Sequence, residues 1–429
     1  MIIVVGAGLA GLTCAKELIA QGQQVLILEQ ADRAGGRVRT DIHDDGYRLD
    51  RGFQVLFTAY PAVQRHLDLD ALKQRKFEPG ALLVKAGKRY EIADPLREPN
   101  RLVKGVLNPL ISPADKLRVL RLRQEVIGLS AGEIFSGKGQ PDGKDESSES
   151  YLRRLGFAEE GFISNFARPF YGGIYLDRSL STSARLLQFT FKMLAKGDII
   201  VPAEGMQSIA EQLVNGLPEG TLRCNTRVHS LQINNGRVEG VRLASGETLK
   251  AASVVIATES PIAEKWLGSK LPTQPRSSIC LYFAGDTRLY NQKKILLNTA
   301  PDAYVNNAVL LTNIVPTYAP PHKHLLSATI LNETETDDEL VARKALTEMR
   351  NWFPESNLDS WKFMGIYRIP FSQFEQAPGV YETLPGNTTG IEGLYLAGEY
   401  TQSSSIQGAM HSGEHAAKAI LRVPAGAAS

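Results

Sequence analysis

Glycine residues near the start of the chain have the spacing that dinucleotide binding requires. The string Gly6-Ala7-Gly8-Leu9-Ala10-Gly11 directly follows an apolar run, and Glu29 ends the next apolar run. Gly6 permits a tight turn, Gly8 lets the backbone approach a pyrophosphate, and Gly11 lets a helix pack closely. A carboxylate at Glu29 can accept both hydroxyls of an adenosine ribose. The predicted contacts of this stretch are Gly6, Ala7, Gly8, Leu9, Ala10, Gly11, Glu29 and Gln30.

A second glycine turn carries an arginine. Gly35-Gly36-Arg37 follows Glu29 within a few residues. The guanidinium fork matches phosphate oxygens, which favours Arg37 against a pyrophosphate over the alternative of a solvated arginine on an ordinary turn. Gly35, Gly36 and Arg37 therefore join the predicted cofactor contacts.

The elements that must position these residues form a strand–helix–strand unit. Ile2-Ile3-Val4-Val5 is typical of a strand buried on both faces, residues 12–21 carry a helical pattern that ends at Gly22, and residues 24–28 read as a second strand. A glycine string alone is a weak signal. In this order, however, the pattern predicts a βαβ unit whose helix N-terminus faces the phosphates.

Together these motifs resemble the flavin amine oxidase, phytoene desaturase and protoporphyrinogen oxidase superfamily of FAD-dependent oxidoreductases. Residues 46–52 match its GxxxDxG segment, and residues 53–61 resemble the stretch that carotene desaturases place beside the flavin ring. Residues 393–401 and 407–413 resemble the strand and helix opening that complete the site. The resemblance implies one FAD per chain. No second GxGxxG follows a later strand, so we expect no fixed NAD(P)H site.

The resemblance assigns further cofactor contacts at matching positions. Glu399 stands where the family usually has Asp, and Ile406-Gln407-Gly408-Ala409 stands where it has Met-Glu-Gly-Ala. The helix opening is expected to act through its backbone N–H groups and its positive end, so the second departure is tolerated. The positions carried over are Gly52, Phe53, Gln54, Val228, Gly398, Glu399, Ile406 and Gln407.

The predicted fold class is α/β. We expect a Rossmann-type, glutathione-reductase-like FAD-binding domain assembled from residues 1–60, 196–261 and 386–429, with a β-meander between about 226 and 249. Residues 61–195 and 262–385 are expected to form an α+β substrate-binding domain.

Composition excludes several classes of protein. A net charge of +2 gives no basic field, so no nucleic-acid partner is expected. The three cysteines do not form a disulfide framework, and His411 and His415 lack a third ligand, so no metal site is predicted. No apolar run reaches the roughly 18–20 residues that span a bilayer, and because the first strand begins at once we expect no targeting segment. We expect a cytoplasmic protein that can lie on a membrane without crossing it.

Residues 95–125 mix basic and apolar side chains, and Ser112-Pro113 and Gly128 predict the start and end of a helix. Either this is a surface helix packed on its domain, or it is an interfacial patch beside a substrate tunnel, as in related desaturases.

Residues 137–150 are predicted to be a mobile loop. Arg168, Tyr171 and Tyr175 either line the substrate cavity or, as is commoner for such aromatics, belong to the core.

The resemblance implies that the flavin accepts a hydride from a substrate C–H bond. The strand expected over the flavin, residues 278–284, lacks the lysine that amine oxidases of the superfamily often carry. We therefore favour an FAD-dependent dehydrogenase or desaturase of a hydrophobic, carotenoid- or isoprenoid-like substrate. Flavin amine oxidase or protoporphyrinogen oxidase is the alternative. A non-redox FAD-dependent isomerase or an FAD-binding scaffold is an alternative of another class. No catalytic residue and no oligomeric state are predicted.

Overall fold

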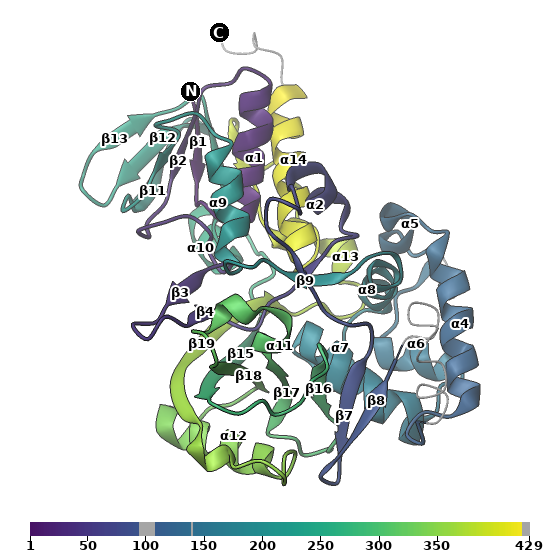
Figure 1. The fold of residues 1–429 in the computed structure, drawn as a ribbon. Coiled ribbons are helices and arrows are strands. Elements are labelled where there is room, and N and C mark those ends of the chain that lie inside the picture. The colour runs from purple at the N-terminus through teal and green to yellow at the C-terminus, as the bar shows by residue number, and fades with distance from the viewer. Residues whose placement is uncertain (94–107, 139, 423–429) are drawn as a thin grey trace.

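The computed structural model describes residues 1–93, 108–138 and 140–422. In Figure 1 the elements from the two ends of the described chain lie together in the upper part, around β1 and α14. The sheet that contains β15 to β19 lies below them, and the helices α4 to α8 lie to one side. Segments far apart in the sequence therefore share one body.

A five-stranded parallel sheet forms the centre of the upper part. Its strand order is β10-β2-β1-β14-β20. Ile3 of β1 lies between Leu26 of β2 and Val254 of β14, which are its register partners. Strands β1, β14 and β20 are almost wholly buried, as their continuous apolar runs predict, whereas β2 is half-buried at Val25 and Leu26 and the edge strand β10 ends in the exposed Arg223. The bounds are β1 Ile2–Val5, β2 Val25–Leu28, β10 Leu222–Arg223, β14 Ser253–Ile256 and β20 Leu394–Leu396.

Two long helices pack together beside this sheet. They are α1, Leu9–Ala20, and α14, Ile406–Arg422. A β-carbon on Gly413 of α14 would lie 2.4 Å from the Ala10 carbonyl oxygen, so the close approach of the two helices depends on glycine. The helix expected from residue 12 begins earlier, at Leu9, because Gly8 has the extended backbone of an N-cap inside the glycine string.

The expected β-meander is present beside the parallel sheet. It consists of β11 Val228–Asn234, β12 Arg237–Leu243 and β13 Thr248–Lys250, joined antiparallel. Helices α9, Gln207–Asn215, and α10, Ser260–Leu267, complete this region.

A seven-stranded mixed sheet forms the lower part, in the order β19-β15-β18-β17-β16-β7-β8. All neighbours are antiparallel except β16 and β7. Helix α12, Asp338–Arg350, lies beside it (Figure 1). The strands are β7 Ala81–Lys85, β8 Lys88–Ile92, β15 Pro275–Gly285, β16 Ile295–Asn298, β17 Val305–Leu310, β18 His324–Leu331 and β19 Lys362–Phe374.

A helical layer flanks the mixed sheet. Its helix α4 runs from Pro113 to Ile127, with Ser112 as N-cap and Gly128 as C-cap, which confirms that prediction. Residues 95–107 of the segment 95–125 lie outside the described residues. The other elements are α5 Ala131–Phe135, α6 Ser148–Arg154, a π-helical turn Glu159–Ala167, α7 Arg168–Tyr175 and α8 Ala184–Lys196.

The prediction of a mobile loop over residues 137–150 is wrong for its second half. The Asp145 carboxylate accepts a hydrogen bond from Ser183 Oγ at 2.6 Å and another from the Gly379 N–H at 3.1 Å. Ser148 is fully buried and donates to the Thr182 carbonyl oxygen. The polar composition reflects side chains that bind the body of the protein, not a solvated segment.

Small sheets and a buried carboxylate join the two parts. The strands are β3 Thr40–Ile42 with β4 Arg48–Asp50, and β5 Leu56–Phe57, β9 Ile199–Val201 and β6 Arg75–Lys76. The remaining short α-helices of the described residues are α2 Pro61–His66, α11 Leu311–Ile314 and α13 Val380–Thr383. No helix among the described residues is long and apolar enough to cross a membrane.

Asp50 is that carboxylate, and it is 3% exposed. It accepts hydrogen bonds from Thr40 Oγ1, from the Met206 N–H and from Tyr318 Oη at 2.5, 3.0 and 2.8 Å. Tyr282 of β15 donates to its carbonyl oxygen. Burial raises the pKa of Asp50 to about 6, although these donors oppose the shift. One side chain thus connects segments of the upper and lower parts.

Candidate functional site

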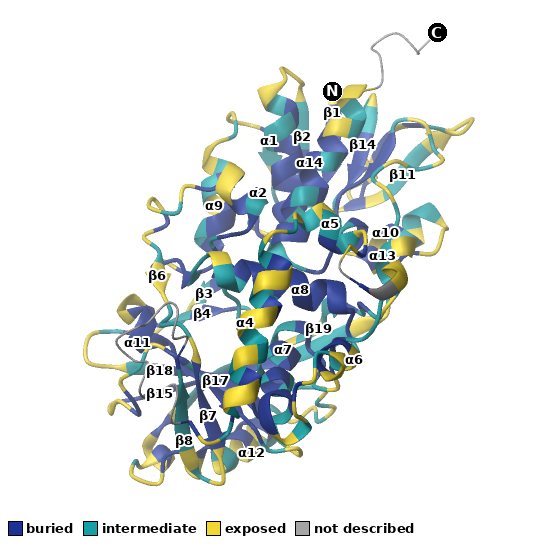
Figure 2. Ribbon diagram, turned by 90° about the vertical axis from the view of Figure 1, so that its right-hand side faces the viewer, coloured by how far each residue is buried: buried dark blue, intermediate teal, exposed yellow. Residues whose placement is uncertain are grey.

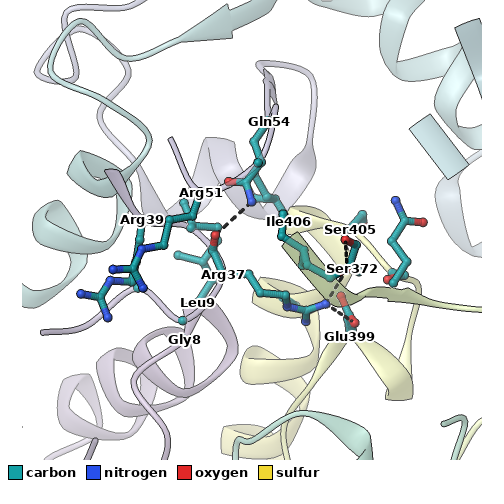
Figure 3. Close-up of a pocket in the computed structure, with 18 of the residues that line it drawn as sticks. Gly8, Leu9, Arg37, Arg39, Arg51, Gln54, Ser372, Glu399, Ser405 and Ile406 are labelled. Atoms are coloured by element: carbon teal, nitrogen blue, oxygen red, sulfur yellow. Dashed lines mark hydrogen bonds and ion pairs between the residues drawn. The ribbon is translucent and has the colours of Figure 1, made fainter. Parts of the chain in front are cut away.

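A cavity of about 1020 Å³ extends from the glycine turn after β1 to the upper face of the mixed sheet. This volume lies at the upper end of the range of about 300–1,000 Å³ that is usual for ligand sites. Figure 3 shows residues from three distant segments around it: Gly8 and Leu9, Arg37 to Gln54, and Ser372 to Ile406. The cavity therefore collects most of the positions that the motifs predicted.

The first glycine turn has the geometry its pattern predicts. Gly6 has φ +109°, and a β-carbon there would lie 2.6 Å from the Ala257 carbonyl oxygen. A β-carbon on Gly11 would lie 2.1 Å from the Gly6 carbonyl oxygen, so only glycine allows α1 to approach the turn. On Gly8 it would meet no atom within 4 Å, because this residue lines the cavity. The turn is thus tightly packed at Gly6 and Gly11 and open to the cavity at Gly8.

The N-terminus of α1 lies at this open side. Gly8 is its N-cap and no side chain caps the helix, so the first backbone N–H groups depend on another acceptor. With the positive end of the helix dipole they suit a phosphate.

Glu29 lies at the end of β2 in the cavity wall and is 8% exposed. Its Oε2 accepts from the Ala7 N–H at 2.8 Å, and its Oε1 accepts from the Ala31 N–H at 2.9 Å. The carboxylate therefore holds the glycine turn against the end of β2. Each oxygen keeps lone-pair capacity for a ligand hydroxyl.

Arg37 bridges three segments across the cavity (Figure 3). Its Nη1 donates to Glu399 Oε1 at 2.8 Å and to the Ser372 carbonyl oxygen at 2.7 Å. Gln54 Nε2 donates to the Arg37 carbonyl oxygen at 3.0 Å. Burial alone lowers the pKa of Arg37, but the Glu399 carboxylate more than offsets this and raises it.

Most predicted positions line the cavity, and three do not. Ala7, Gly11 and Gln407 lie behind the wall; the Gln407 Oε1 accepts from the Ala62 N–H at 2.9 Å. The positions in the wall are Gly6, Gly8, Leu9, Ala10, Glu29, Gln30, Gly35, Gly36, Arg37, Gly52, Phe53, Gln54, Val228, Gly398, Glu399 and Ile406.

The sequence interpretation missed other wall residues. Arg39 and Arg51 line the cavity and are ion-paired with Asp32 and Asp41. Both adjoin predicted motifs, and that proximity is the signal that could have identified them. Ser372 also lines the cavity, but no local pattern marks it, because its position depends on β19 crossing below the glycine turns.

The part of the cavity over the mixed sheet is mainly apolar. Tyr171 and Tyr175 belong to the core, and the opposite side of α7 lines the cavity through Phe170, Gly173 and Ile174. The wall also contains Phe53, Val55, Phe57, Tyr60, Phe77, Leu176, Ile199, Ile295, Leu297 and Ile369. From β15 it takes Ser278 and Cys280, with no lysine.

The Cys280 thiol on the floor of the cavity is held neutral. Burial raises the pKa of the Cys280 thiol to about 11, and its Sγ lies 3.3 Å from Ser327 Oγ. The rings of His411 and His415 are 4.2 Å apart between centroids and tilted by 55°, and both residues lie outside the cavity wall. Among the described residues, no group of three or more His, Cys, Asp or Glu has the arrangement of a metal site.

The fold is that of a mixed α/β protein, and its cavity reaches the glycine turn and the uncapped N-terminus of α1, groups that suit a phosphate-bearing cofactor. The model of the family described as flavin containing amine oxidoreductase matches residues 9–421. The chain therefore belongs to this family, and it is an FAD-dependent oxidoreductase.

Relatives and solved structures cover nearly the whole chain. The 15-cis-phytoene desaturase of Glycine max is 25% identical and covers 98% of this chain and 79% of its own length. The zeta-carotene desaturase of Synechocystis sp. is 25% identical, with 98% and 97% covered. A solved putrescine oxidase bound to putrescine superposes with TM-score 0.72 at 18% identity over 98% of each chain. An oxidoreductase from Methanosarcina mazei gives 0.71 at 19% identity, with 98% of this chain and 99% of its own covered.

The residues present fit an FAD. There is open space in front of Gly8 for a pyrophosphate. The backbone N–H groups at the uncapped N-terminus of α1 and the Arg37 guanidinium provide hydrogen-bond donors for its two phosphates. Glu29 provides an acceptor at the end of β2, where a ribose is bound in dinucleotide folds. The apolar part of the cavity is continuous with these groups.

Proposed function

We propose that this protein is a dehydrogenase or desaturase of a hydrophobic, carotenoid- or isoprenoid-like substrate. The observation that carries the proposal is the continuity of one cavity from the glycine turn to an apolar chamber over the mixed sheet. The names of the phytoene and zeta-carotene desaturases among its relatives support the same substrate class.

The proposed FAD-binding domain is of the Rossmann type and discontinuous. Residues 1–60, 196–261 and 386–429 contribute it, and residues 61–195 and 262–385 contribute the substrate-binding domain. The sheet order β10-β2-β1-β14-β20 supports this division, because its strands come from all three of the first segments. The proposed FAD contacts are the motif positions in the cavity wall, with Ala7, Gly11 and Gln407 supporting them from behind.

The bound flavin supplies the hydride acceptor. The chain excludes water and orients the substrate: Phe53, Phe170 and Ile174 face a chamber closed below by the mixed sheet. Cys280 remains a protonated thiol near neutral pH because burial raises its pKa, so it provides no anionic base at the floor. The lack of a lysine on the cavity side of β15 favours this function over amine oxidation.

A membrane surface is the proposed route for such a substrate. Helix α4 exposes Leu117 and Leu120 at 67% and 38%, with Arg121 beside them. Figure 2 shows exposed positions along the outer face of α4. Apolar and cationic side chains on one helix suit an anionic bilayer surface.

Anaerobic reduction of the bound flavin tests the proposal. The visible absorption of oxidised flavin should bleach when phytoene or a shorter isoprenoid is added in detergent, and a desaturated product should appear in equal amount. Putrescine and protoporphyrinogen serve as comparison substrates. Bleaching by putrescine alone would place the protein with the amine oxidases. Isomerised product without net bleaching would make it an isomerase.

A further inference from the structure

A polar row crosses the apolar chamber on the upper face of the mixed sheet. Cys280 of β15 is the register partner of Thr329 of β18, Thr329 is the partner of Asn307 of β17, and Asn307 is the partner of Leu297 of β16. Lateral partners in a sheet point to the same face, and all four residues line the cavity. A wholly apolar substrate would not need the three polar members of this row.

A chain of hydrogen bonds leads to this row from a cation outside the cavity wall. Arg178, which follows α7, donates from Nη1 to Asn306 Oδ1 at 2.8 Å. Asn306 Nδ2 donates to Asn307 Oδ1 at 2.8 Å, and Asn307 Nδ2 donates to Thr329 Oγ1 at 3.3 Å. Every link runs in the same direction, from the guanidinium toward the cavity.

The chain ends in donors that have no acceptor in the described part of the protein. The Thr329 hydroxyl accepts from Asn307, so its own O–H is free to donate. The second N–H of Asn307 Nδ2 also has no acceptor among the described residues. Thr329 and Asn307 are 6% and 3% exposed, and both lie in the cavity wall.

The cation at the start of the chain is not neutralised by an ion pair. Arg178 donates otherwise to the carbonyl oxygens of Asn298 and Ala300, and no described carboxylate lies within ion-pair distance of it. Burial lowers the pKa of Arg178, as expected for a desolvated cation, and it remains charged. Hydrogen bonds in series from a charged donor polarise one another, which strengthens the last donors.

A glycine leaves the space for this arrangement. A β-carbon on Gly173, in the cavity wall, would lie 2.8 Å from Asn306 Nδ2 and 3.2 Å from Asn307 Oδ1. The hydrogen bond between the two amides therefore depends on the absence of a side chain on α7 at this position.

We infer that Asn307 and Thr329 bind an oxygen atom of the substrate, so that within the isoprenoid class the site prefers a molecule with a hydroxyl, ether or carbonyl oxygen over a pure hydrocarbon such as phytoene. This inference rests on the proposed function. A hydrocarbon would displace water from the two donors and leave them unpaired, whereas an oxygen acceptor satisfies them.

Three C15 probes that differ in one group test the inference on the FAD-loaded protein. Farnesol and its methyl ether offer an oxygen acceptor, and farnesene does not. Affinities are measured by equilibrium dialysis in detergent and by the change in flavin absorption. Farnesol and the ether should bind about tenfold more tightly than farnesene, as one hydrogen bond to polarised donors predicts.

Thr329→Val keeps the branched shape and removes the hydroxyl. It should lower the preference, because the oxygen-bearing probes lose one donor and farnesene no longer leaves that donor unpaired, while the Asn307 N–H groups remain. Thr299→Val is the matched control, because Thr299 is buried beside the same sheet, bonds to the Val84 carbonyl oxygen and lies outside the cavity wall. It should keep the preference.

Equal affinity for all three probes, or a preference that Thr329→Val leaves unchanged, would overturn the inference and leave the proposed function standing. Binding of none of the probes by the yellow, FAD-loaded protein would overturn both.

Discussion

The Arg37 guanidinium lies 2.8 Å from the Glu399 carboxylate, and the two residues come from opposite ends of the described chain. The Glu399 side chain is 8% exposed. A charge-assisted bond in such a setting stabilises the assembled site more than a surface ion pair does. Glu399, which replaces the usual Asp of the family, thereby links the second glycine turn to the turn after β20.

Glu399→Gln should lower the free energy of unfolding by about 1–3 kcal/mol, because a partly buried guanidinium loses its charged acceptor. Glu399→Asp should cost less, since the charge remains. Denaturant unfolding of the FAD-free protein measures both. The control is Glu392→Gln, which removes the exposed partner of Arg237 and should cost no more than about 1 kcal/mol. Equal effects at both positions would contradict this role of Arg37.

Glu29→Ala should release FAD. The Ala7 and Ala31 N–H groups lose their acceptor, which loosens the glycine turn, and the ribose loses a charged acceptor at about 1.5–3 kcal/mol for each bond. Flavin absorbance retained after dialysis measures the effect, and Glu219→Ala, at an exposed position, is the control. Full retention of FAD would exclude Glu29 from the ribose site.

The stability of the protein should depend on the protonation of Asp50. Its pKa in the folded state is about 6, against an ordinary value of 3.8. The folded state therefore binds a proton that the unfolded state releases, so this contribution is complete below pH 3.8 and is lost as the pH rises through 6. The unfolding free energy of the wild type minus that of Asp50→Asn should fall by up to about 3 kcal/mol between pH 4 and pH 7. A constant difference would show that Asp50 does not titrate in this range.

Binding to anionic vesicles should depend on α4. Sedimentation with phosphatidylglycerol vesicles should recover the protein at low salt and lose it near physiological ionic strength, where the Debye length is about 8 Å. A variant with Leu117→Ser, Leu120→Ser and Arg121→Gln should not sediment and should keep its FAD. Arg118 is left unchanged because it pairs with the buried Asp115. Replacing Arg118 would leave Asp115 buried without its partner, so a loss of vesicle binding could then result from misfolding. If the triple variant still bound the vesicles, the membrane contact would have to lie outside α4.

The sequence correctly predicted the part of the site that is formed by residues close together in the chain. The residues from Ile2 to Glu29 form consecutive elements, so hydrophobic period and glycine position determined their fold. The turn after β20 was found through the family resemblance. The helix α4 was predicted because both of its ends carry capping residues.

Long-range pairing decided what the sequence interpretation missed. Asn307 and Thr329 lie in unremarkable strands and share a face only because β17 and β18 pair in one register. Asp145 was assigned to a mobile loop because the partners that bind it, Ser183 and Gly379, are remote in sequence. The amino-acid composition of a segment does not reveal which distant residues will form hydrogen bonds with it.

The order of strands in the parallel sheet also sets when during synthesis the sheet can form. β1 ends at Val5, but the strand order is complete only with β20, which begins at Leu394, and α14 then packs on α1. Until that late part has left the ribosome, β14 has an open edge and the apolar face of α1 has no cover. Strand pairs between residues far apart in sequence form slowly, and hydrophobic surface stays exposed until they have formed. The nascent chain therefore keeps these surfaces uncovered until β20 and α14 have emerged, and the proposed FAD site can be assembled only then.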